Sequence, residues 1–187
     1  MNYPKGLNKN YKSKTTFGNR GMSLESDINN SNAYYLQTNK AIIHKKPVPI
    51  TIAKVEYITP PVIKEAYFKT PSTTDYNGLY KGKYIDFEAK ETKYKSFPLN
   101  NIHKHQIKHL TDIVNHKGLS FIIVSFTTLN KVFLIKTIDL IDYYKTDKKS
   151  IPLEYFIEKA FIINEGFNPR LDYLKTLDIA FREELNE

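Results

Sequence analysis

The stretch DYNGLYKGKYIDFEAK, residues 75–90, predicts a β-hairpin. Its turn is expected at residues 81–82, because the glycine there tolerates the positive φ that tight hairpin turns require. Counting outward in pairs from this turn places Asp75 directly opposite Glu88. Facing residues of an antiparallel pair have Cβ atoms only about 5 Å apart. Two carboxylates held so close repel each other unless a cation lies between them, so the hairpin predicts a cation site.

The second arm of this hairpin has one polar face. Side chains alternate along a strand, so Asp86, Glu88 and Lys90 share a face with Asp75. Carboxylate oxygens suit Mg²⁺, and a metal-bound water is a nucleophile for phosphodiester hydrolysis. Lys90 would stabilise the phosphate charge or orient the water. The alternative is a solvated strand face with an ordinary surface lysine, and a register shift of one residue would separate the carboxylates.

Composition bounds the class of protein. The 187 residues suit one domain of ordinary size. Lys and Arg number 28 against 20 Asp and Glu, and this net charge of +8 favours a polyanionic partner, either nucleic acid or an anionic membrane surface. No stretch approaches the roughly 20 apolar residues of a membrane span, and no secretory signal is evident. Together with the absence of cysteine this fits a cytoplasmic protein. Of the two polyanionic partners, nucleic acid is the one expected, with no membrane partner. The absence of cysteine excludes disulfides and thiolate zinc sites.

The chain divides into an N-terminal arm and one domain. Residues 1–17 carry four lysines and no acidic residue, which predicts a disordered basic arm that either contacts phosphates or is a soluble tail. Residues 18–187 are expected to form a single domain. Residues 48–58 and 62–68 have strand character on either side of a Pro-Pro pair, which predicts a protruding hairpin because proline cannot donate to a sheet ladder.

The remaining elements indicate an α/β fold with a mixed sheet. A helix is expected over residues 23–37 and a strand over 41–44. Asn100 or Asn101 could cap a second helix, which would run to about residue 116 with Gly118 as its C-cap. Residues 119–126 are almost continuously apolar, which predicts a strand buried on both faces. A further strand is expected at 132–135, with helices near 138–144, 152–159 and 173–185.

Several runs resemble a known family. Asp75, twelve intervening residues, and then the run from Glu88 to Lys90 form the pattern of PD-(D/E)XK nucleases. More specific runs resemble the RecU family of Holliday junction resolvases over about residues 18–172; these runs are residues 19–22, 43–47, 62–68, 72–78, 84–93, 96–99 and 105–106.

This resemblance implies a restriction-endonuclease-like fold, a mixed β-sheet flanked by helices with a protruding β-stalk at about residues 50–68. It implies a homodimer that makes paired, symmetric nicks in four-way DNA junctions during homologous recombination and DNA repair, with Mg²⁺ or Mn²⁺ as cofactor. Recombinase and branch-migration proteins are further implied partners. By motif matching, the metal ligands would be Thr73, Asp75, Glu88 and Gln106. Lys90 would stabilise the transition state. The uncharged stalk tip at residues 58–61 departs from the basic tips common in the family.

Other side chains are weaker candidates. The basic residues expected to bind DNA are Arg20, Lys45, Lys46, Lys93 and Lys95. Glu25 resembles an accessory helical carboxylate of such nucleases, although an acid near a helix N-terminus is equally explained by the helix dipole. His105 and His109 are interpreted as a solvent-facing pair near DNA, because no third zinc ligand is evident.

Two rival functions remain open at this point. A junction-binding or recombination-modulating protein without nuclease activity would not need the intact set of Asp75, Glu88 and Lys90. A restriction-type nuclease that acts on linear duplex is compatible with the hairpin alone.

Overall fold

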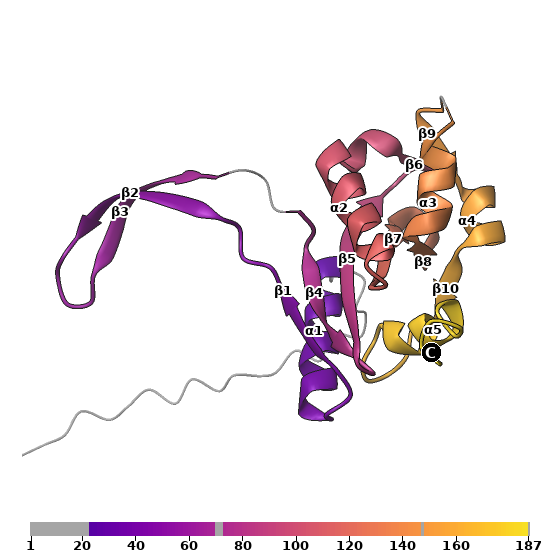
Figure 1. The fold of residues 1–187 in the computed structure, drawn as a ribbon, viewed down its shortest axis with the longest axis horizontal. Coiled ribbons are helices and arrows are strands. Elements are labelled where there is room, and N and C mark those ends of the chain that lie inside the picture. The colour runs from indigo at the N-terminus through magenta and orange to yellow at the C-terminus, as the bar shows by residue number, and fades with distance from the viewer. Residues whose placement is uncertain (1–22, 70–72, 147, 187) are drawn as a thin grey trace, which may run out of the picture.

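A mixed sheet forms the centre of the computed structural model, which describes residues 23–69, 73–146 and 148–186. The strand order of the sheet (Figure 1) is β1 (Ile42–Lys45), β4 (Tyr76–Tyr80), β5 (Lys83–Thr92), β7 (Leu119–Phe126), β8 (Lys131–Lys136) and β10 (Phe161–Ile163). Strands β5 and β7 run parallel, and the other neighbouring pairs of this sheet are antiparallel. The predicted mixed α/β architecture with flanking helices is therefore confirmed.

The β4–β5 hairpin has the predicted turn and register. Lys81 and Gly82 adopt positive φ angles of 47° and 77°, and the turn residues pair the strands with Tyr80 opposite Lys83. The register continues to Tyr76 opposite Phe87. One further step along the two strands brings Asp75 to the level of Glu88.

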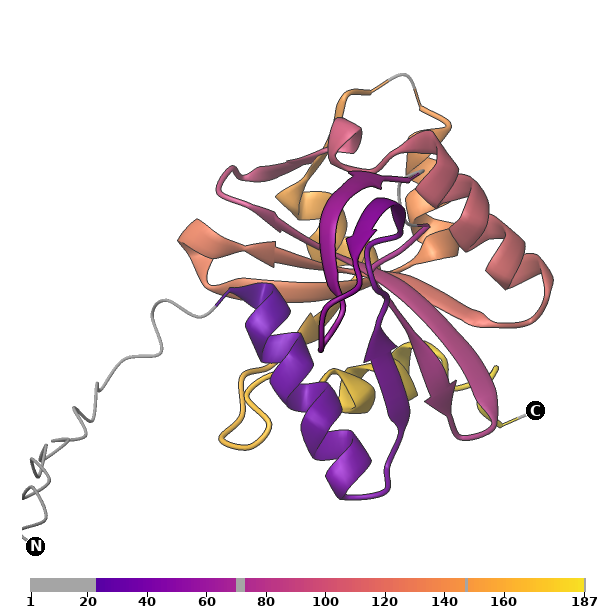
Figure 2. The same ribbon diagram turned by 90° about the vertical axis from the view of Figure 1, so that its left-hand side faces the viewer.

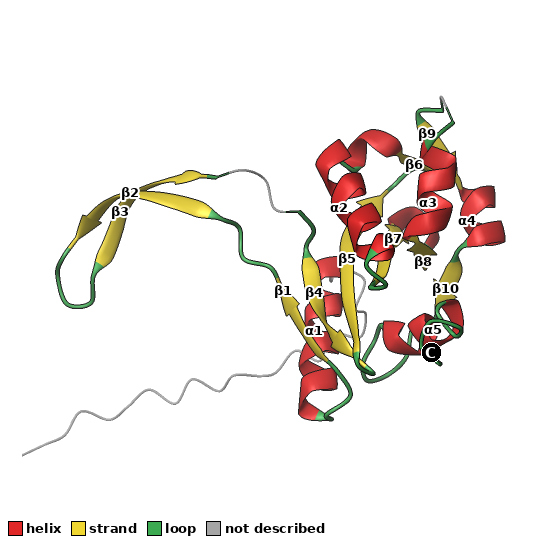
Figure 3. Ribbon diagram, viewed as in Figure 1, coloured by secondary structure: helices red, strands yellow, loops and turns green. Residues whose placement is uncertain are grey.

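Helices cover both faces of the sheet (Figure 3). Helices α1 (Leu24–Gln37) and α5 (Tyr173–Ala180) pack into one hydrophobic cluster. Helices α2 (Lys104–Asn115), α3 (Thr137–Tyr144) and α4 (Leu153–Lys159) pack into a second cluster. Strand β7 contributes Phe121 and Ile123 to the first cluster and Ile122 and Val124 to the second, so its predicted burial on both faces is confirmed.

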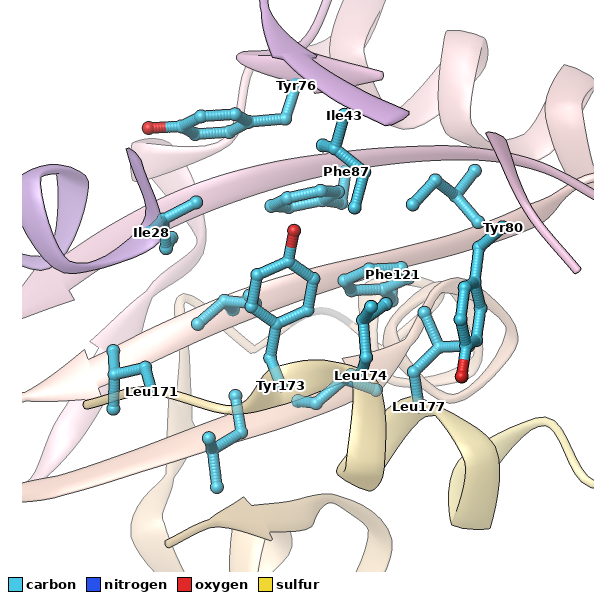
Figure 4. Packing of buried hydrophobic residues seen from close by; sticks show 14 of the residues in the cluster. Ile28, Ile43, Tyr76, Tyr80, Phe87, Phe121, Leu171, Tyr173, Leu174 and Leu177 are labelled. Carbon is cyan, nitrogen blue, oxygen red and sulfur yellow. The ribbon is translucent and has the colours of Figure 1, made fainter. Parts of the chain in front are cut away.

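A stack of three aromatic rings crosses the sheet on the side of α1 and α5 (Figure 4). The Phe87 ring lies 4.9 Å from that of Tyr76 and 4.7 Å from that of Phe121, with interplanar angles of 10°. Because alternate side chains of a strand point to opposite faces, burial of Phe87 here directs Asp86 and Glu88 toward the face that α2 covers.

The predicted protruding hairpin is also confirmed. Strands β2 (Ile50–Glu56) and β3 (Val62–Phe68) pair antiparallel and stand away from the sheet (Figure 1). Figure 2 views this hairpin from its projecting end, in front of the sheet. Their side chains are exposed apart from that of Val55, which is half-buried. We call residues 50–68 the stalk. It carries large exposed rings, with Tyr57 at 88% and Phe68 at 85% exposure.

Two local expectations around α2 were wrong. His103 precedes the first residue of the helix as its N-cap, whereas Asn100 and Asn101 lie in the 3₁₀ turn η1 (Leu99–Asn101). The left-handed residue after the helix is Lys117, with φ of 65°, and not Gly118. Gly118 is required for space instead, since a Cβ there would lie 2.7 Å from the Ile113 Cγ2 atom.

A small second sheet was not indicated by the sequence. It pairs β6 (Ser96–Pro98) with β9 (Ser150–Pro152), segments that are far apart along the chain. Three residues are too few to show a strand period, so only the tertiary pairing defines these strands.

Replacing residues 50–68 with a short Gly-Ser linker should change the free energy of unfolding by no more than about 0.5 kcal/mol, because the stalk buries little surface. Phe87→Ala should instead cost about 3–5 kcal/mol, because it leaves a cavity in the aromatic stack. Urea denaturation followed by circular dichroism measures both effects. A large loss of stability on replacing the stalk would contradict its independence from the core.

Candidate active site

Of the two carboxylates predicted to hold a cation, one lies just before β4 and the other lies on the adjoining strand β5. Asp75 directly precedes β4, and its Oδ2 atom accepts a hydrogen bond of 3.3 Å from the Ala89 N–H of β5. The main-chain oxygen of Asp75 accepts a 2.7 Å bond from the Lys46 N–H, which extends the β1–β4 ladder by one step. Glu88 lies in the middle of β5 and is 1% exposed. The structure therefore brings Asp75 beside the strand that carries Glu88.

Glu88 is a buried acid with one unused oxygen. Its Oε1 atom pairs with the Lys90 ammonium at 2.6 Å. Its Oε2 atom is buried and has no hydrogen-bond partner among the described residues. Burial raises the pKa of Glu88, and the charge of Asp75 raises it further, while hydrogen bonds from Lys90 and Gln106 act in the opposite direction; the net shift is upward. The carboxylate thus lies where a further positive charge would stabilise its ionised form.

The residues at this position fit a hard divalent cation. Such a cation prefers oxygen ligands, and the buried Oε2 atom of Glu88 is an oxygen that lacks a donor. Within the described ranges, no group of three or more His, Cys, Asp or Glu side chains is placed to hold a metal. A cation at Asp75 and Glu88 would therefore need neutral ligands such as a hydroxyl, an amide oxygen or water.

The two predicted neutral ligands differ in their surroundings. Gln106 lies in the first turn of α2, is 6% exposed, and its side chain lies near enough to Glu88 to lower the pKa of that acid. Its Oε1 atom accepts a 3.0 Å bond from the His103 N–H, which leaves that oxygen a second lone pair. Thr73 is exposed, and its hydroxyl accepts a 3.3 Å bond from the Lys46 ammonium. Metal ligation by Thr73, Asp75, Glu88 and Gln106, and transition-state stabilisation by Lys90, stay predictions.

Asp86 is the residue of this site whose role sequence reasoning missed. It is fully buried, two residues before Glu88 on the same face of β5. Its Oδ1 atom accepts a hydrogen bond from the Thr74 hydroxyl. Its Oδ2 atom lies 2.8 Å from the Lys46 ammonium, 2.9 Å from the Tyr84 hydroxyl and 3.2 Å from His109 Nε2. The alternation along the strand placed Asp86 on the polar face, but it gave no signal that the role of Asp86 differs from that of Glu88.

The interpretation of His109 as solvent-facing was wrong. Its ring lies against the buried carboxylate of Asp86, and its side chain is only 25% exposed. The reason is geometric, because α2 runs antiparallel to β5 across this face, which brings Gln106 over Glu88 and His109 over Asp86.

Glu25 lies at the rim of the same site. A cavity of about 280 Å³ is lined by residues from α1, the start of β4 and the end of β5, among them Glu25, Asp75 and Lys90. The Leu24 N–H donates a 2.8 Å hydrogen bond to Glu91 Oε1, which fixes the N-terminus of α1 to β5. Glu25 itself pairs with the Lys45 ammonium. Its role as an accessory acid stays a prediction.

The basic residues predicted to bind DNA occupy different environments. Lys93 and Lys95 are exposed in the connection between β5 and β6, and the Lys45 side chain is 41% exposed. The Lys46 side chain is only 16% exposed and points to Asp86. Arg20 and the arm of residues 1–17 lie outside the described residues. DNA contact by these residues stays a prediction.

Glu88→Gln should raise the melting temperature of the metal-free protein at pH 7–8. The folded state raises the pKa of Glu88, so ionisation of this acid destabilises the fold above the folded-state pKa. The gain should shrink as the pH falls toward the unfolded-state pKa of a glutamate, because Glu88 is then protonated in both states. Thermal melts in EDTA across this range measure the effect. A lower melting temperature of the variant at pH 8 would contradict the upward shift.

Comparisons with known proteins identify the family of this chain. A family model described as RecU: Recombination protein U matches residues 19–179. Proteins named Holliday junction resolvase RecU from Bacillus cereus (strain AH820) and Bacillus anthracis are 46% identical over 196 residues, covering 97% of this chain and 98% of each relative. Among solved structures, Archaeoglobus fulgidus Hjc, a Holliday junction resolvase, aligns with a TM-score of 0.44 and 10% identity over 71% of this chain and 93% of its own. The family match and the 46% identity show that the chain belongs to the RecU family.

Proposed function

We propose that this protein is a structure-specific endonuclease that resolves Holliday junctions by paired, symmetric, metal-dependent nicks during homologous recombination and DNA repair. The observation that carries the proposal is the juxtaposition of Asp75 with a buried Glu88 that has an unused oxygen and a lysine partner. The RecU relatives at 46% identity, which are named Holliday junction resolvases, support junction DNA as the substrate.

Each residue of the site has a distinct role in this proposal. Asp75 and Glu88 would hold Mg²⁺ or Mn²⁺, with Thr73 and Gln106 as neutral ligands. When bound, the cation would supply Lewis acidity and a water of lowered pKa. Lys90 is 25% exposed and lies between the buried carboxylate and the open cavity, from where its ammonium can contact a phosphate oxygen. A positive charge there stabilises the charge that develops on the phosphate in the transition state.

The proposed partners follow from the reaction. Two symmetric nicks require two equivalent active sites, which a two-fold homodimer supplies. The net charge of +8 favours a DNA partner, and the stalk offers exposed aromatic rings rather than a basic tip. Recombinase and branch-migration proteins are further proposed partners, and the cytoplasm is the proposed location. In the part of the chain that the structure describes, every helix is too short or too polar to span a bilayer.

A labelled mobile four-way junction and a matched linear duplex should be distinguished in a cleavage assay. With Mg²⁺ we expect symmetric nicks on the junction, little cutting of the duplex, and no cutting of either in EDTA. Comparable cutting of the duplex would favour a restriction-type nuclease. Tight junction binding without cleavage in Mg²⁺ and in Mn²⁺ would favour a protein that acts by binding alone.

Asp75→Ala should lower the junction cleavage rate by at least about 100-fold, because it removes a predicted metal ligand whose loss costs several kcal/mol of transition-state stabilisation. Junction affinity in EDTA should stay within about threefold of that of the unsubstituted protein, because the Asp75 carboxylate has no hydrogen-bond donor for a DNA phosphate. The matched control is Asp178→Ala, an acid that pairs with Lys81 at the far end of the same hairpin. Loss of junction binding by Asp75→Ala would instead indicate a structural role.

A further inference from the structure

The segment that carries Thr73 and Asp75 lies outside the regular structure. Residues 73–75 precede β4 and belong to neither a helix nor a strand. A sheet ladder fixes only the last of them, through the bond from the Lys46 N–H to the Asp75 oxygen. A metal site requires its ligands within a few tenths of an ångström of their productive positions, so other contacts must hold this segment.

The Lys46 ammonium contacts two of these three residues. Its ammonium group lies 2.8 Å from Asp86 Oδ2, 2.5 Å from the Thr74 hydroxyl and 3.3 Å from the Thr73 hydroxyl. An ammonium has three N–H donors, and these three acceptors use all of them. No donor of Lys46 is therefore left for a DNA phosphate while these contacts persist.

Asp86 anchors the other end of the same contacts. It accepts from Thr74 with one oxygen and from Lys46, Tyr84 and the His109 ring with the other. A carboxylate accepts about four hydrogen bonds, so these four donors engage Asp86 in structural contacts, with three of them on Oδ2. Its four partners come from the residues after β1, from the segment before β4, from β5 itself and from α2.

We propose that Lys46 and Asp86 are positioning residues, a buried ion pair that holds residues 73–75 against β5 so that Thr73 and Asp75 face Glu88. Lys46 then acts on metal binding and cleavage rather than on DNA affinity. The inference rests on the proposed function, because it takes Thr73, Asp75 and Glu88 as metal ligands.

The choice of an ion pair over apolar packing is consistent with this role. A buried ion pair loses much of its Coulomb attraction to desolvation, and apolar side chains of the same volume often stabilise a fold as well. What the pair adds is direction, because each hydrogen bond fixes a specific atom of the segment. Lys46 is also the first residue of the connection from β1 to the stalk strand β2, so the residue that contacts Thr73 and Thr74 lies near the base of the stalk.

Three variants test the inference without relying on one that fails to fold. Lys46→Met combined with Asp86→Asn removes both charges together, so no buried charge is left unpaired. Thr74→Val removes the hydroxyl that joins residues 73–75 to the pair, and Thr74→Ser keeps it. The matched control is Lys81→Met with Asp178→Asn, a lysine–aspartate pair of 2.7 Å at the opposite end of the hairpin. Circular dichroism verifies that each variant is folded at the assay temperature.

Each variant is measured in three ways: Mn²⁺ binding to the DNA-free protein by titration calorimetry, junction affinity in EDTA at several salt concentrations, and single-turnover cleavage at saturating protein. For the Lys46/Asp86 double variant and for Thr74→Val, we expect Mn²⁺ affinity and cleavage rate to fall by at least about tenfold. Junction affinity and its salt dependence should be unchanged. Thr74→Ser and the control pair should behave as the original protein does.

Two results would overturn the inference. If the double variant loses junction affinity and its salt slope falls by about one while Mn²⁺ binding is normal, Lys46 is a phosphate contact. If folded variants match the original protein in all three measurements, the pair contributes stability alone. Failure of the proposed function would be seen separately, because the unsubstituted protein would then bind Mn²⁺ but would not cleave junctions. The Mn²⁺ comparison among variants still tests the positioning role in that case.

Discussion

The opposed faces of strand β5 are the constraint on which this structure depends. One face places Phe87 between the rings of Tyr76 and Phe121, and the other carries Asp86, Glu88 and Lys90 under helix α2. A slip of one residue would expose polar groups to an aromatic core and aromatic rings to a polar site. Packing on the aromatic face therefore determines the register, and the register determines which carboxylates meet.

Two carboxylates on this strand are both buried, yet they differ in kind. Asp86 has a donor for each oxygen, whereas Glu88 has a buried oxygen with no partner among the described residues. A satisfied buried carboxylate stabilises the arrangement around it, while an unsatisfied one destabilises the fold until a cation or proton arrives. The pKa of Glu88 is shifted upward for the same reason, because burial disfavours its ionised form. The proposed metal site therefore coincides with a position that lowers the stability of the metal-free fold.

The stalk illustrates a different balance. Its strands pair with each other but bury almost nothing against the domain, so the sheet needs no contribution from them. The rings of Tyr57 and Phe68 are exposed, and aromatic rings can stack on nucleic-acid bases. In the proposed function, these exposed rings would let the stalk contact a DNA junction.

The sequence by itself determined the elements whose signal is local. Each of these elements follows from a period or a turn residue within about ten positions: the turn at residues 81–82, the alternation along β5, the helix that begins near residue 23, and the strand β7 that is buried on both faces. Those signals were enough to place Asp75 level with Glu88, because a tight turn fixes the register of a hairpin.

Only the tertiary structure decided how the polar groups are shared. Donors from four separated segments decide three features of the site. They turn Lys46 toward Asp86, they turn His109 toward the same carboxylate, and they leave Glu88 as the acid with an unpartnered oxygen among the described residues. The cap of α2 at His103 and the pairing of β6 with β9 depend on distant contacts in the same way. Hydrogen-bond saturation is a property of three-dimensional neighbours, and no sequence period encodes it.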